Sequence, residues 1–575
     1  MYKILRFLKP YRISVVFILI LMFLQSLAQL YLPTLMSNIV DIGIVKGNTT
    51  YIWRIGGLML LVAGIGGLCT ILSSFISSKT AVGVGRDIRS AVFSRVESYS
   101  LHEFNKIGPA SLITRTTNDI TQVQQVLVMI LRLMISAPMM AIGGIIMAVS
   151  KDATLSLVLV VVIPILAGTI YIVASKGIRL FKIMQTKLDK VNLVMRENLT
   201  GIRVIRAFNR QEHERVRFNS ANLELTSTAI KVNKIMAALM PIMMLVMNFT
   251  TIAIVWFGSI RVNQGDMQVG DMMAFIQYAM QIMFSLIMFS FMFILIPRAE
   301  ASAVRINEVF EMMPEITDAA ELKLADHKHG FVEFRNVTFS YPGAEQPAIN
   351  NISFFAKPGQ VSAIIGGTGS GKSTLISLIP RFYDIDSGAI FVDGVDVRVM
   401  AQADLRAKIG FVPQSAILFT GTIAENIRYG KDDATKDEIA HAAKIAQATE
   451  FIDSMPDGFD SIIAQGGTNV SGGQKQRLSI ARALVRKPEV YIFDDSFSAL
   501  DFKTDAKLRA ALIHETLDST VLIVAQRVST VINADQIICL DEGRVAGIGT
   551  HKELMKTCDV YREIVSSQLS EEEIA

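Results

Sequence analysis

The chain has 575 residues, a net charge of only +4 and a mean hydropathy of +0.42, with hydrophobic residues making up 51% of it. This composition is too apolar for an ordinary soluble protein, and the length is enough for several domains. The net charge is small and we identify no nucleic-acid-binding patch, so we expect no nucleic-acid partner. The cysteines are far apart in the sequence and predict neither a disulfide framework nor a metal site; they are Cys69, Cys539 and Cys558.

The apolar residues are concentrated before about residue 297. Residues 2–12 carry basic residues at helical spacing with apolar residues between them, which predicts a short amphipathic helix on the membrane surface. The first apolar run is long enough to span a bilayer and has no small-residue cleavage site, so we expect no cleaved signal peptide. In all, six runs predict transmembrane helices in a lipid bilayer. They are residues 13–38, 55–78, 126–149, 154–174, 237–260 and 273–296.

Lysine and arginine gather in the second-to-third and fourth-to-fifth connections between these runs. The positive-inside rule therefore predicts that these connections and both termini are cytoplasmic. Structureless loops of this length would be unusual, so we expect the membrane helices to continue into the cytoplasm. The predicted reversals lie near residues 98–107 and 208–217. These tips either dock onto a soluble domain or are solvated helical hairpins, and charge alone does not separate the two.

Arg132 and the methionine-rich runs of the membrane part each have two interpretations. Arg132 lies inside the third apolar run, where a charge is costly. It is either a functional residue or a side chain that snorkels or faces a water-filled cavity. The fifth and sixth runs are rich in methionine and contain no Asp or Glu. Flexible methionines suit a surface that accepts many apolar ligands, but they also suit gap-filling or lipid-facing packing.

We place the membrane domain at residues 1–312, a polar linker at 313–330 and a soluble domain at 331–575. In the soluble domain, GGTGSGKS fits the phosphate-binding pattern G-x-x-x-x-G-K-[ST]. It follows a β-branched run and precedes a helical run, which places a polyphosphate at a helix N-terminus. Lys372 would reach the β/γ-phosphates and Ser373 would bind Mg²⁺. The predicted nucleotide-binding residues are Gly366, Gly367, Thr368, Gly369, Ser370, Gly371, Lys372, Ser373 and Thr374.

Three further runs predict strands: residues 331–341, 490–495 and 521–526. The second ends in two carboxylates, and Asp494 is placed to hold Mg²⁺ through water. The third ends at Gln526. Because strands alternate with helices, we expect a mostly parallel sheet with the nucleotide at its carboxyl edge.

VSGGQ, residues 470–474, predicts a second anion site, with Ser471 as the N-cap of a helix. The chain's own phosphate-binding loop lies at a different helix. We therefore expect this second site to face the γ-phosphate of a nucleotide that another chain holds.

These motifs resemble an ATP-binding cassette (ABC) exporter half-transporter over nearly the whole chain. GGTGSGKS resembles Walker A, YIFDD resembles Walker B, VSGGQ resembles the signature motif and SALD resembles the D-loop. TRTTND and RENLTGIRVIRAF resemble the exporters' intracellular helices. The resemblance implies an α-helical six-span transmembrane domain followed by an α/β P-loop nucleotide-binding domain of ABC type. It also implies docked cytoplasmic tips, and a dimer that sandwiches two ATP molecules head to tail and alternates between inward and outward access.

The resemblance also assigns roles to single residues. Tyr341 matches the aromatic residue that stacks on adenine, and Gln414 matches the Q-loop glutamine that contacts Mg²⁺. Asp501 matches the D-loop aspartate. The implied cofactors are ATP and Mg²⁺, with Ser373, Gln414 and Asp494 as the metal residues. The signature residues expected to hold the partner's ATP are Ser471, Gly472, Gly473 and Gln474.

The chain departs from the family pattern at the site built on its own Walker motifs, which we call the Walker site. Asp495 stands where the family has a glutamate that orients the attacking water, and Gln526 stands where it has a switch histidine. Gln465 also replaces a glutamate that often precedes the signature. The shorter carboxylate is retracted by roughly 1 to 1.5 Å, and a misplacement of that size can cost about 10²-fold. An amide can hydrogen-bond a phosphate but cannot become cationic.

We therefore expect a Walker site that binds ATP but hydrolyses it slowly, with Asp495, Gln526 and Gln414 as its catalytic residues. The intact signature would serve the competent site of a second half-transporter, as in the degenerate-site subunit of heterodimeric multidrug exporters. The alternative is a homodimer in which Asp495 suffices. The predicted function is ATP-driven export of hydrophobic or amphipathic small molecules across the cytoplasmic membrane. A lipid or peptide exporter and a nucleotide-gated channel or sensor are the alternatives.

Overall fold

The computed structural model describes residues 3–323 and 329–569, so part of the predicted linker, residues 324–328, lies outside the described residues. The chain divides into two compact units. The first unit holds residues 1–98 and 107–313. The second unit holds residues 99–106 and 314–575.

Six helices among the described residues are long and apolar enough to cross a membrane, in agreement with the six predicted runs. Most are much longer than the roughly 20 residues that a bilayer requires. At 1.5 Å per residue, the 49 residues of α2 extend over about 70 Å. The elements of this part of the chain are η1 (Ile4–Tyr11), α1 (Arg12–Asn38), η2 (Ile39–Ile44), α2 (Thr49–Glu97), α3 (Leu101–Ile107), α4 (Pro109–Thr114), η3 (Arg115–Asp119), α5 (Ile120–Lys151), α6 (Leu157–Thr200), α7 (Ile202–Ala207), α8 (Gln211–Gln264) and α9 (Val269–Glu311).

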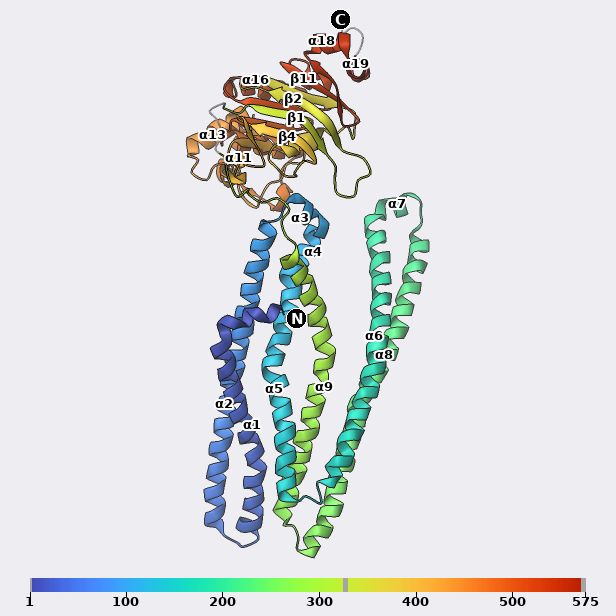
Figure 1. The fold of residues 1–575 in the computed structure, drawn as a ribbon. Helices are drawn as coiled ribbons and strands as arrows, with labels where there is room; N and C mark the ends of the chain where they lie inside the picture. Colours follow the sequence, from blue (N-terminus) through green and yellow to red (C-terminus); the bar gives the residue numbers. More distant parts are fainter. Residues whose placement is uncertain (1–2, 324–328, 570–575) are drawn as a thin grey trace. The chain divides into compact units, whose positions relative to one another are not determined.

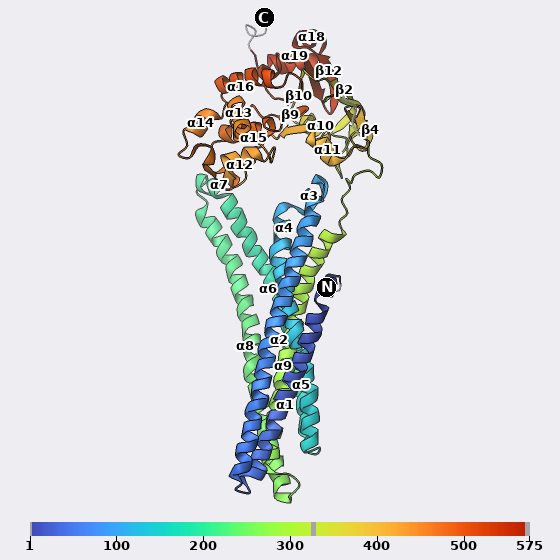
Figure 2. The same cartoon turned by 90° about the vertical axis from the view of Figure 1, so that its left-hand side faces the viewer.

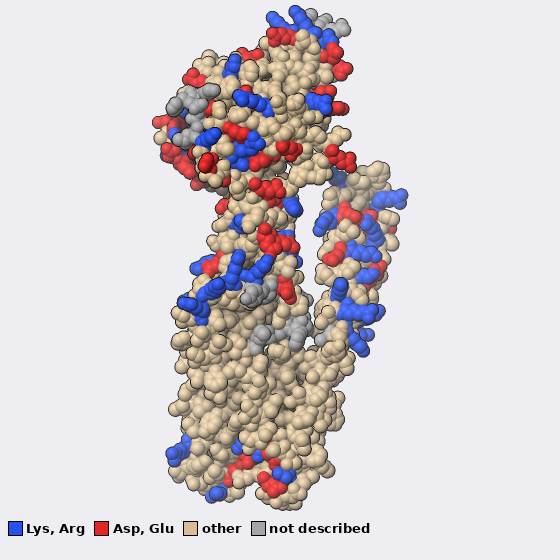
Figure 3. All heavy atoms as spheres, in the orientation of Figure 1, with Lys and Arg blue, Asp and Glu red and all other residues tan. Residues whose placement is uncertain are grey.

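Within the first unit, the helices α6 and α8 pair with each other and leave the other four long helices toward α7 (Figures 1 and 2). On the face that Figure 3 shows, charged side chains lie near both ends of these helices, and a wide band between them is almost free of charge. An uncharged band along long apolar helices is the kind of surface that a bilayer requires.

The predicted amphipathic segment is the 3₁₀-helix η1, which packs against the C-terminal end of α9. Phe7 lies 5.9 Å from Phe310 between ring centroids, and the Arg6 guanidinium lies over both rings. Lys3 also pairs with Glu311. The apolar side chains of this segment are therefore partly used for packing within the unit.

The connection between α2 and α5 reverses at α3, inside the predicted range 98–107. Residues 99–106 belong to the second unit. Here the Glu103 carboxylate is buried, and it accepts hydrogen bonds from the backbone N–H of Ser100 at 2.7 Å and of Glu315 at 3.2 Å. The bond to Glu315 joins this tip to the predicted linker, and the grouping of residues 99–106 with the second unit favours docking over a solvated hairpin.

The connection between α6 and α8 reverses between Thr200 and Gln211. This is earlier than the predicted range 208–217, most of which already belongs to α8. Glu212 and Glu214 lie in the first turn of α8, where the helix dipole stabilises negative charge. These acidic residues explain why the helix begins there.

The second unit is built on two main sheets. One has the strand order β2-β1-β4-β5 and is antiparallel; the other has the order β12-β11-β3-β10-β9-β6 and is parallel except at β12. The strands are β1 (Val332–Phe339), β2 (Ile349–Ala356), β3 (Val361–Gly366), β4 (Ser387–Val392), β5 (Val395–Asp396), β6 (Ile409–Val412), β7 (Gly421–Thr422), β8 (Ile462–Ile463), β9 (Val490–Asp494), β10 (Thr520–Val524), β11 (Gln536–Asp541) and β12 (Arg544–Gly549). The predicted six-span domain followed by an α/β domain is confirmed.

Helices cover this parallel sheet and leave the carboxyl ends of β3, β10, β9 and β6 next to one another. They are α10 (Lys372–Leu378), α11 (Gln402–Ala407), α12 (Ile423–Arg428), α13 (Lys436–Ile445), α14 (Thr449–Asp453), α15 (Gly472–Leu484), α16 (Phe502–Glu515), α17 (Val528–Val531), α18 (His551–Thr557) and α19 (Asp559–Ser566), with the short 3₁₀-helices η4 (Gly458–Asp460) and η5 (Gln465–Gly467).

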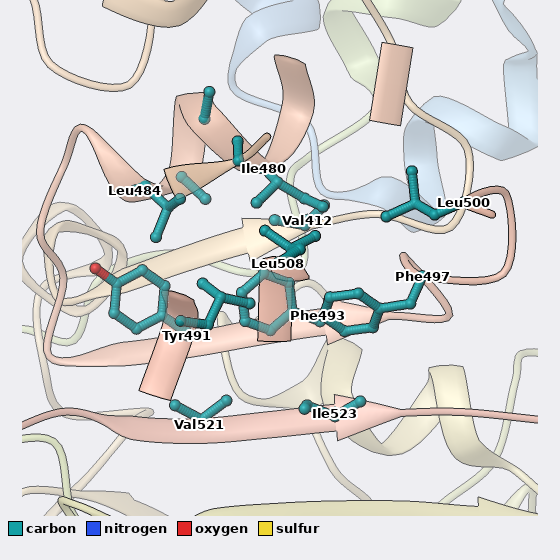
Figure 4. Close-up of a cluster of buried hydrophobic side chains, with 14 of the residues drawn as sticks. Val412, Ile480, Leu484, Tyr491, Phe493, Phe497, Leu500, Leu508, Val521 and Ile523 are labelled. Carbon is teal, nitrogen blue, oxygen red and sulfur yellow. The ribbon is translucent and has the colours of Figure 1, made fainter. Parts of the chain in front are cut away.

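The core between the parallel sheet and its helices is formed by alternate residues of buried strands. Tyr491 and Phe493 of β9 point to the same face, with ring centroids 6.2 Å apart, and Phe497 continues the row (Figure 4). Cys539 and Cys558 meet in this core as free thiols, although they are far apart in the sequence. A continuous core beneath β9 fixes the strand that carries the predicted acidic residues.

A buried ion pair ties β4 to the sheet edge. Asp393 is fully buried, and its carboxylate accepts from the backbone N–H of Gly330 at 2.6 Å and from Lys408 Nζ at 2.8 Å. We expect Lys408→Met to cost about 2 kcal/mol, because it removes hydrogen bonds between charged groups. Calorimetry of the purified full chain should show a lower unfolding midpoint. Lys552→Met, at an exposed lysine of α18, is the control and should leave the midpoint unchanged.

Candidate functional site

The predicted phosphate-binding loop joins β3 to α10, as the sequence pattern requires. Gly369 and Gly371 have φ values of +81° and +93°, which L side chains rarely adopt. A Cβ on Gly371 would also lie 2.6 Å from the Ala348 carbonyl oxygen. Lys372 Nζ donates to the carbonyl oxygens of Gly366 at 2.9 Å and Gly367 at 2.6 Å, so its ammonium lies across the loop. Burial lowers the pKa of Lys372.

The other predicted loop residues, Thr368, Ser370, Ser373 and Thr374, lie on this same turn and on the first turn of α10. Ser373 faces the end of β9, and its Oγ donates to Asp494 Oδ1 at 2.9 Å. Burial raises the pKa of Asp494, and the hydrogen bond from Ser373 partly opposes that shift. A buried carboxylate beside a hydroxyl is a pair of oxygen ligands that suits a cation.

The three predicted catalytic residues come together around one carboxylate oxygen. Gln526 Nε2 lies 3.1 Å and Gln414 Nε2 lies 3.4 Å from Asp495 Oδ2. Gln526 follows β10, Asp495 follows β9 and Gln414 follows β6. These parallel strands lie side by side in the order β10-β9-β6, so their carboxyl ends meet at one edge of the sheet. Asp495 has a φ of +46°, and its N–H donates to the Val524 carbonyl oxygen at 3.0 Å. Burial raises the pKa of Asp495.

Tyr341 lies just beyond β1, which ends at Phe339 rather than at Tyr341 as predicted. Its ring packs edge-on against Phe339 and Tyr383, with centroids 5.0 and 5.4 Å away. Its hydroxyl is 3.0 Å from Thr374 Oγ1 on α10. These contacts hold the ring beside the phosphate-binding loop. Because 39% of the residue remains exposed, the ring has free surface for a planar ligand.

The signature residues begin α15, away from the phosphate-binding loop. Ser471 Oγ accepts from Gln474 N–H at 3.3 Å, and Gln474 Oε1 accepts from Ser471 N–H at 2.8 Å, so the two form a capping box. A Cβ on Gly472 would meet no atom within 4 Å, and one on Gly473 would lie 3.2 Å from the Ala499 carbonyl oxygen. Figure 2 shows α15 and α10 as separate helices.

Asp501 caps α16 and accepts from Thr504 N–H at 2.9 Å. Hydrogen bonding by the side chain and the backbone of Thr504 lowers the pKa of Asp501. Gln465 is exposed on η5. These placements separate the predicted residues into two groups. The phosphate-binding loop, Tyr341 and the Asp494 and Asp495 carboxylates form one group, and the signature residues form another at α15.

The donor set fits Mg²⁺ better than a metal held by protein alone. Among the described residues, no group of three His, Cys, Asp or Glu side chains could hold an ion. Mg²⁺ in nucleotide sites takes one or two protein ligands and completes its shell with phosphate oxygens and water. Ser373 and Asp494 supply such a pair, whereas Gln414 contacts Asp495 instead.

Two contacts of this site were not expected from the sequence. Ser498 Oγ donates to the Asp495 carbonyl oxygen at 2.8 Å, which holds the backbone of the acidic pair. Tyr383, which follows α10, packs edge-on against Tyr341. Ser498 is the first residue of SALD, so the motif could have indicated it, whereas a single tyrosine after a helix carries no such signal.

Comparison with known proteins gives the family of both units. Residues 15–286 match the model of the ABC transporter transmembrane region, and residues 349–498 match the ABC transporter model. An uncharacterised ABC transporter ATP-binding protein of Mycobacterium tuberculosis is 42% identical over 98% of this chain and 97% of its own length. The uncharacterised ABC transporter ATP-binding protein YfiB of Bacillus subtilis is 42% identical over 100% and 99%.

A solved structure of a bacterial Atm1-family ABC exporter with ATP bound has a TM-score of 0.81 and 26% identity, over 97% of this chain and 99% of that one. Two relatives whose names state what they transport are less similar to this chain. The ATP-dependent lipid A-core flippase of Pseudomonas putida is 33% identical over 89% of this chain and 85% of its own length. A Bacillus subtilis protein provisionally named for multidrug export is 31% identical over 99% of both chains.

Proposed function

The chain belongs to the ABC transporters, with the exporter fold, and from this premise we propose that it is the degenerate-site half of a heterodimeric exporter. As a family member it is a multi-pass membrane protein whose ATPase domain binds ATP and couples hydrolysis to transport, and such half-transporters act as dimers. The proposal adds slow hydrolysis at this chain's Walker site and an intact signature for the partner's ATP.

The Asp495 cluster is the observation that carries the proposal. The Asp495 carboxylate accepts from two neutral amides, Gln526 and Gln414, and neither can become cationic next to a developing negative charge. An attacking water would have to reach a carboxylate that is one methylene shorter than a glutamate. By contrast, the capping box of Ser471 and Gln474 fixes the first turn of α15. The N-terminus of a helix is a favourable binding site for an anion.

The test is the ATPase activity of the purified full chain, first alone and then with its co-purifying half-transporter. We expect the lone chain to be nearly silent and the pair to turn over. A lone chain with a turnover of about 10 s⁻¹ or more, an ordinary enzyme rate, would instead identify an active homodimer.

We propose that the cargo is a hydrophobic or amphipathic small molecule. Helices α1, α5, α8 and α9 line a cavity of about 650 Å³ in the first unit. Methionine, glutamine and serine side chains dominate its described lining, which contains no charged residue. Such a lining suits neutral apolar ligands with a few hydrogen-bonding groups. Arg132 lies half-buried beside Leu133, which lines the cavity, and its functional role stays a prediction.

The orientation and domain limits complete the proposal. The basic connections between α2 and α5 and between α6 and α8 support placing the second unit and both termini in the cytoplasm. The proposed domains are residues 1–312 and 331–575, joined by 313–330. Mg²⁺ is proposed to lie at Ser373 and Asp494, where it would neutralise phosphate charge.

Adenine stacking gives a separate prediction about Tyr341. We expect Tyr341→Ala to raise the Kd for ATP about 10-fold, because stacking of a base on an aromatic ring contributes ~1–3 kcal/mol. Tyr341→Phe keeps the ring and should stay within about 3-fold of the unchanged chain. Fluorescence titration of the full chain in lipid nanodiscs measures both. Tyr429→Ala, at an exposed tyrosine following α12, is the control and should bind ATP normally.

A further inference from the structure

The last described residues of the chain contact the loop that carries Gln526. Gln568 lies two residues beyond the end of α19, which Figure 1 labels, and next to the last described residue, Leu569. Its Oε1 accepts from Val528 N–H at 2.8 Å, and its Nε2 donates to the Gln526 carbonyl oxygen at 2.8 Å. We propose that Gln568 is a positioning residue that fixes the Gln526 side chain toward the γ-phosphate of ATP.

Gln568 follows a helix that is anchored in the core of the second unit. Tyr561 and Val565 of α19 are fully buried in the same core as Val528, at the start of α17. The Gln568 N–H also donates to the Val565 carbonyl oxygen at 3.0 Å, which continues the end of the helix. Gln568 itself is exposed, so water could satisfy its amide. The two bonds to the loop therefore follow from the placement of α19 rather than from a need to pair a buried polar group.

The loop is held from both sides of Gln526. On the strand side, Ala525 N–H donates to the Ile364 carbonyl oxygen at 3.1 Å, which ties the loop to β3. On the other side, Gln568 bonds the carbonyl of Gln526 itself. With the backbone fixed at both points, the Gln526 side chain reaches Asp495 Oδ2 at 3.1 Å. Loss of the Gln568 contact would free the Gln526 peptide to rotate.

This inference rests on the proposed role of Gln526 at the γ-phosphate, which ATP has and ADP lacks. The measurement is therefore the ratio of the Kd values for MgADP and MgATP, determined on the full chain in lipid nanodiscs. We expect Gln568→Leu to lower this ratio about 5-fold, because it weakens the binding of ATP and leaves the binding of ADP unchanged. A 5-fold change corresponds to the typical contribution of one neutral hydrogen bond. Gln568→Glu keeps an acceptor for Val528 N–H but loses the donor to Gln526, so it should lower the ratio as well.

Ser567→Ala is the matched control, because Ser567 Oγ bonds only its own helix, at the Ile564 carbonyl oxygen. It should leave the ratio unchanged. A double-mutant cycle with Gln526→Ala separates positioning from general damage. If Gln568 acts through the Gln526 side chain, Gln568→Leu should have no further effect in the Gln526→Ala background.

The outcomes are distinguishable. If Gln526→Ala lowers the ratio but both Gln568 variants leave it unchanged, the positioning role is overturned and the role of Gln526 stands. Equal weakening of ATP and ADP binding, or an undiminished effect in the Gln526→Ala background, also overturns it. If Gln526→Ala leaves the ratio unchanged, the proposed role of Gln526 fails, and the inference built on it fails too.

Discussion

Replacing Asp495 by glutamate and Gln526 by histidine together is expected to raise ATP hydrolysis at the Walker site by about 10²-fold. The added methylene moves the carboxylate about 1 Å closer to the attacking water, and a displacement of that size can change the rate by about 10²-fold. The histidine supplies a group that can become cationic beside the γ-phosphate. In the structure the Gln526 side chain already donates to Asp495 Oδ2 at 3.1 Å, so the two substitutions act at one point.

The experiment is best carried out in the heterodimer, with the partner's competent site silenced at its catalytic carboxylate, so that only the Walker site turns over. Single-turnover hydrolysis then reports the chemical step. Asp495→Asn combined with Gln526→His is the matched control, because it keeps the new histidine but removes the carboxylate, and it should stay silent. If the Asp495→Glu and Gln526→His pair hydrolyses no faster than the unchanged chain, the slow step lies elsewhere than at these residues.

The parts of the fold that local periodicity determines were predictable. Six apolar runs gave the six membrane helices, and GGTGSGKS between a β-branched run and a helical run gave β3, the loop and α10. The gathering of Asp495, Gln526 and Gln414 was not predictable from periodicity. It depends on the order β3-β10-β9-β6, a non-local pairing that no pattern in the sequence specifies. The family resemblance assigned the three residues to one site without giving this order.

Single contacts between distant segments were missed for a related physical reason. Glu103 bonds the backbone of Glu315, and Gln568 bonds that of Gln526, through one side chain each. An isolated glutamate or glutamine has no pattern that separates it from an ordinary surface residue. The early start of α8 was signalled by Glu212 and Glu214, whose charges favour a helix N-terminus. The contacts of Glu103 and Gln568, which the sequence did not indicate, join the tip at α3 to the linker and the end of α19 to the loop of Gln526.

A carboxylate at the start of α15 should nearly abolish turnover of the heterodimer. We expect Gly472→Asp to lower its ATPase activity by about 10²- to 10³-fold, the cost of losing one preorganised interaction with a developing anion. Gly472 suits this test because a Cβ there meets no atom within 4 Å and its φ is not in the left-handed region. An acidic residue in a first helical turn is stabilising, so folding should be unaffected.

Lys436→Asp is the matched control, because Lys436 is exposed at the first position of α13, behind the capping box of Thr435 and Glu438. It places the same carboxylate at the same helical position away from the predicted sites, and it should leave turnover unchanged. ATP binding at the chain's own Walker site should also be normal in Gly472→Asp. If the Gly472→Asp heterodimer keeps more than half of its turnover, α15 does not face the ATP that the partner holds. Loss of turnover with intact ATP binding would mean that this chain contributes its signature, rather than its carboxylate, to the productive site.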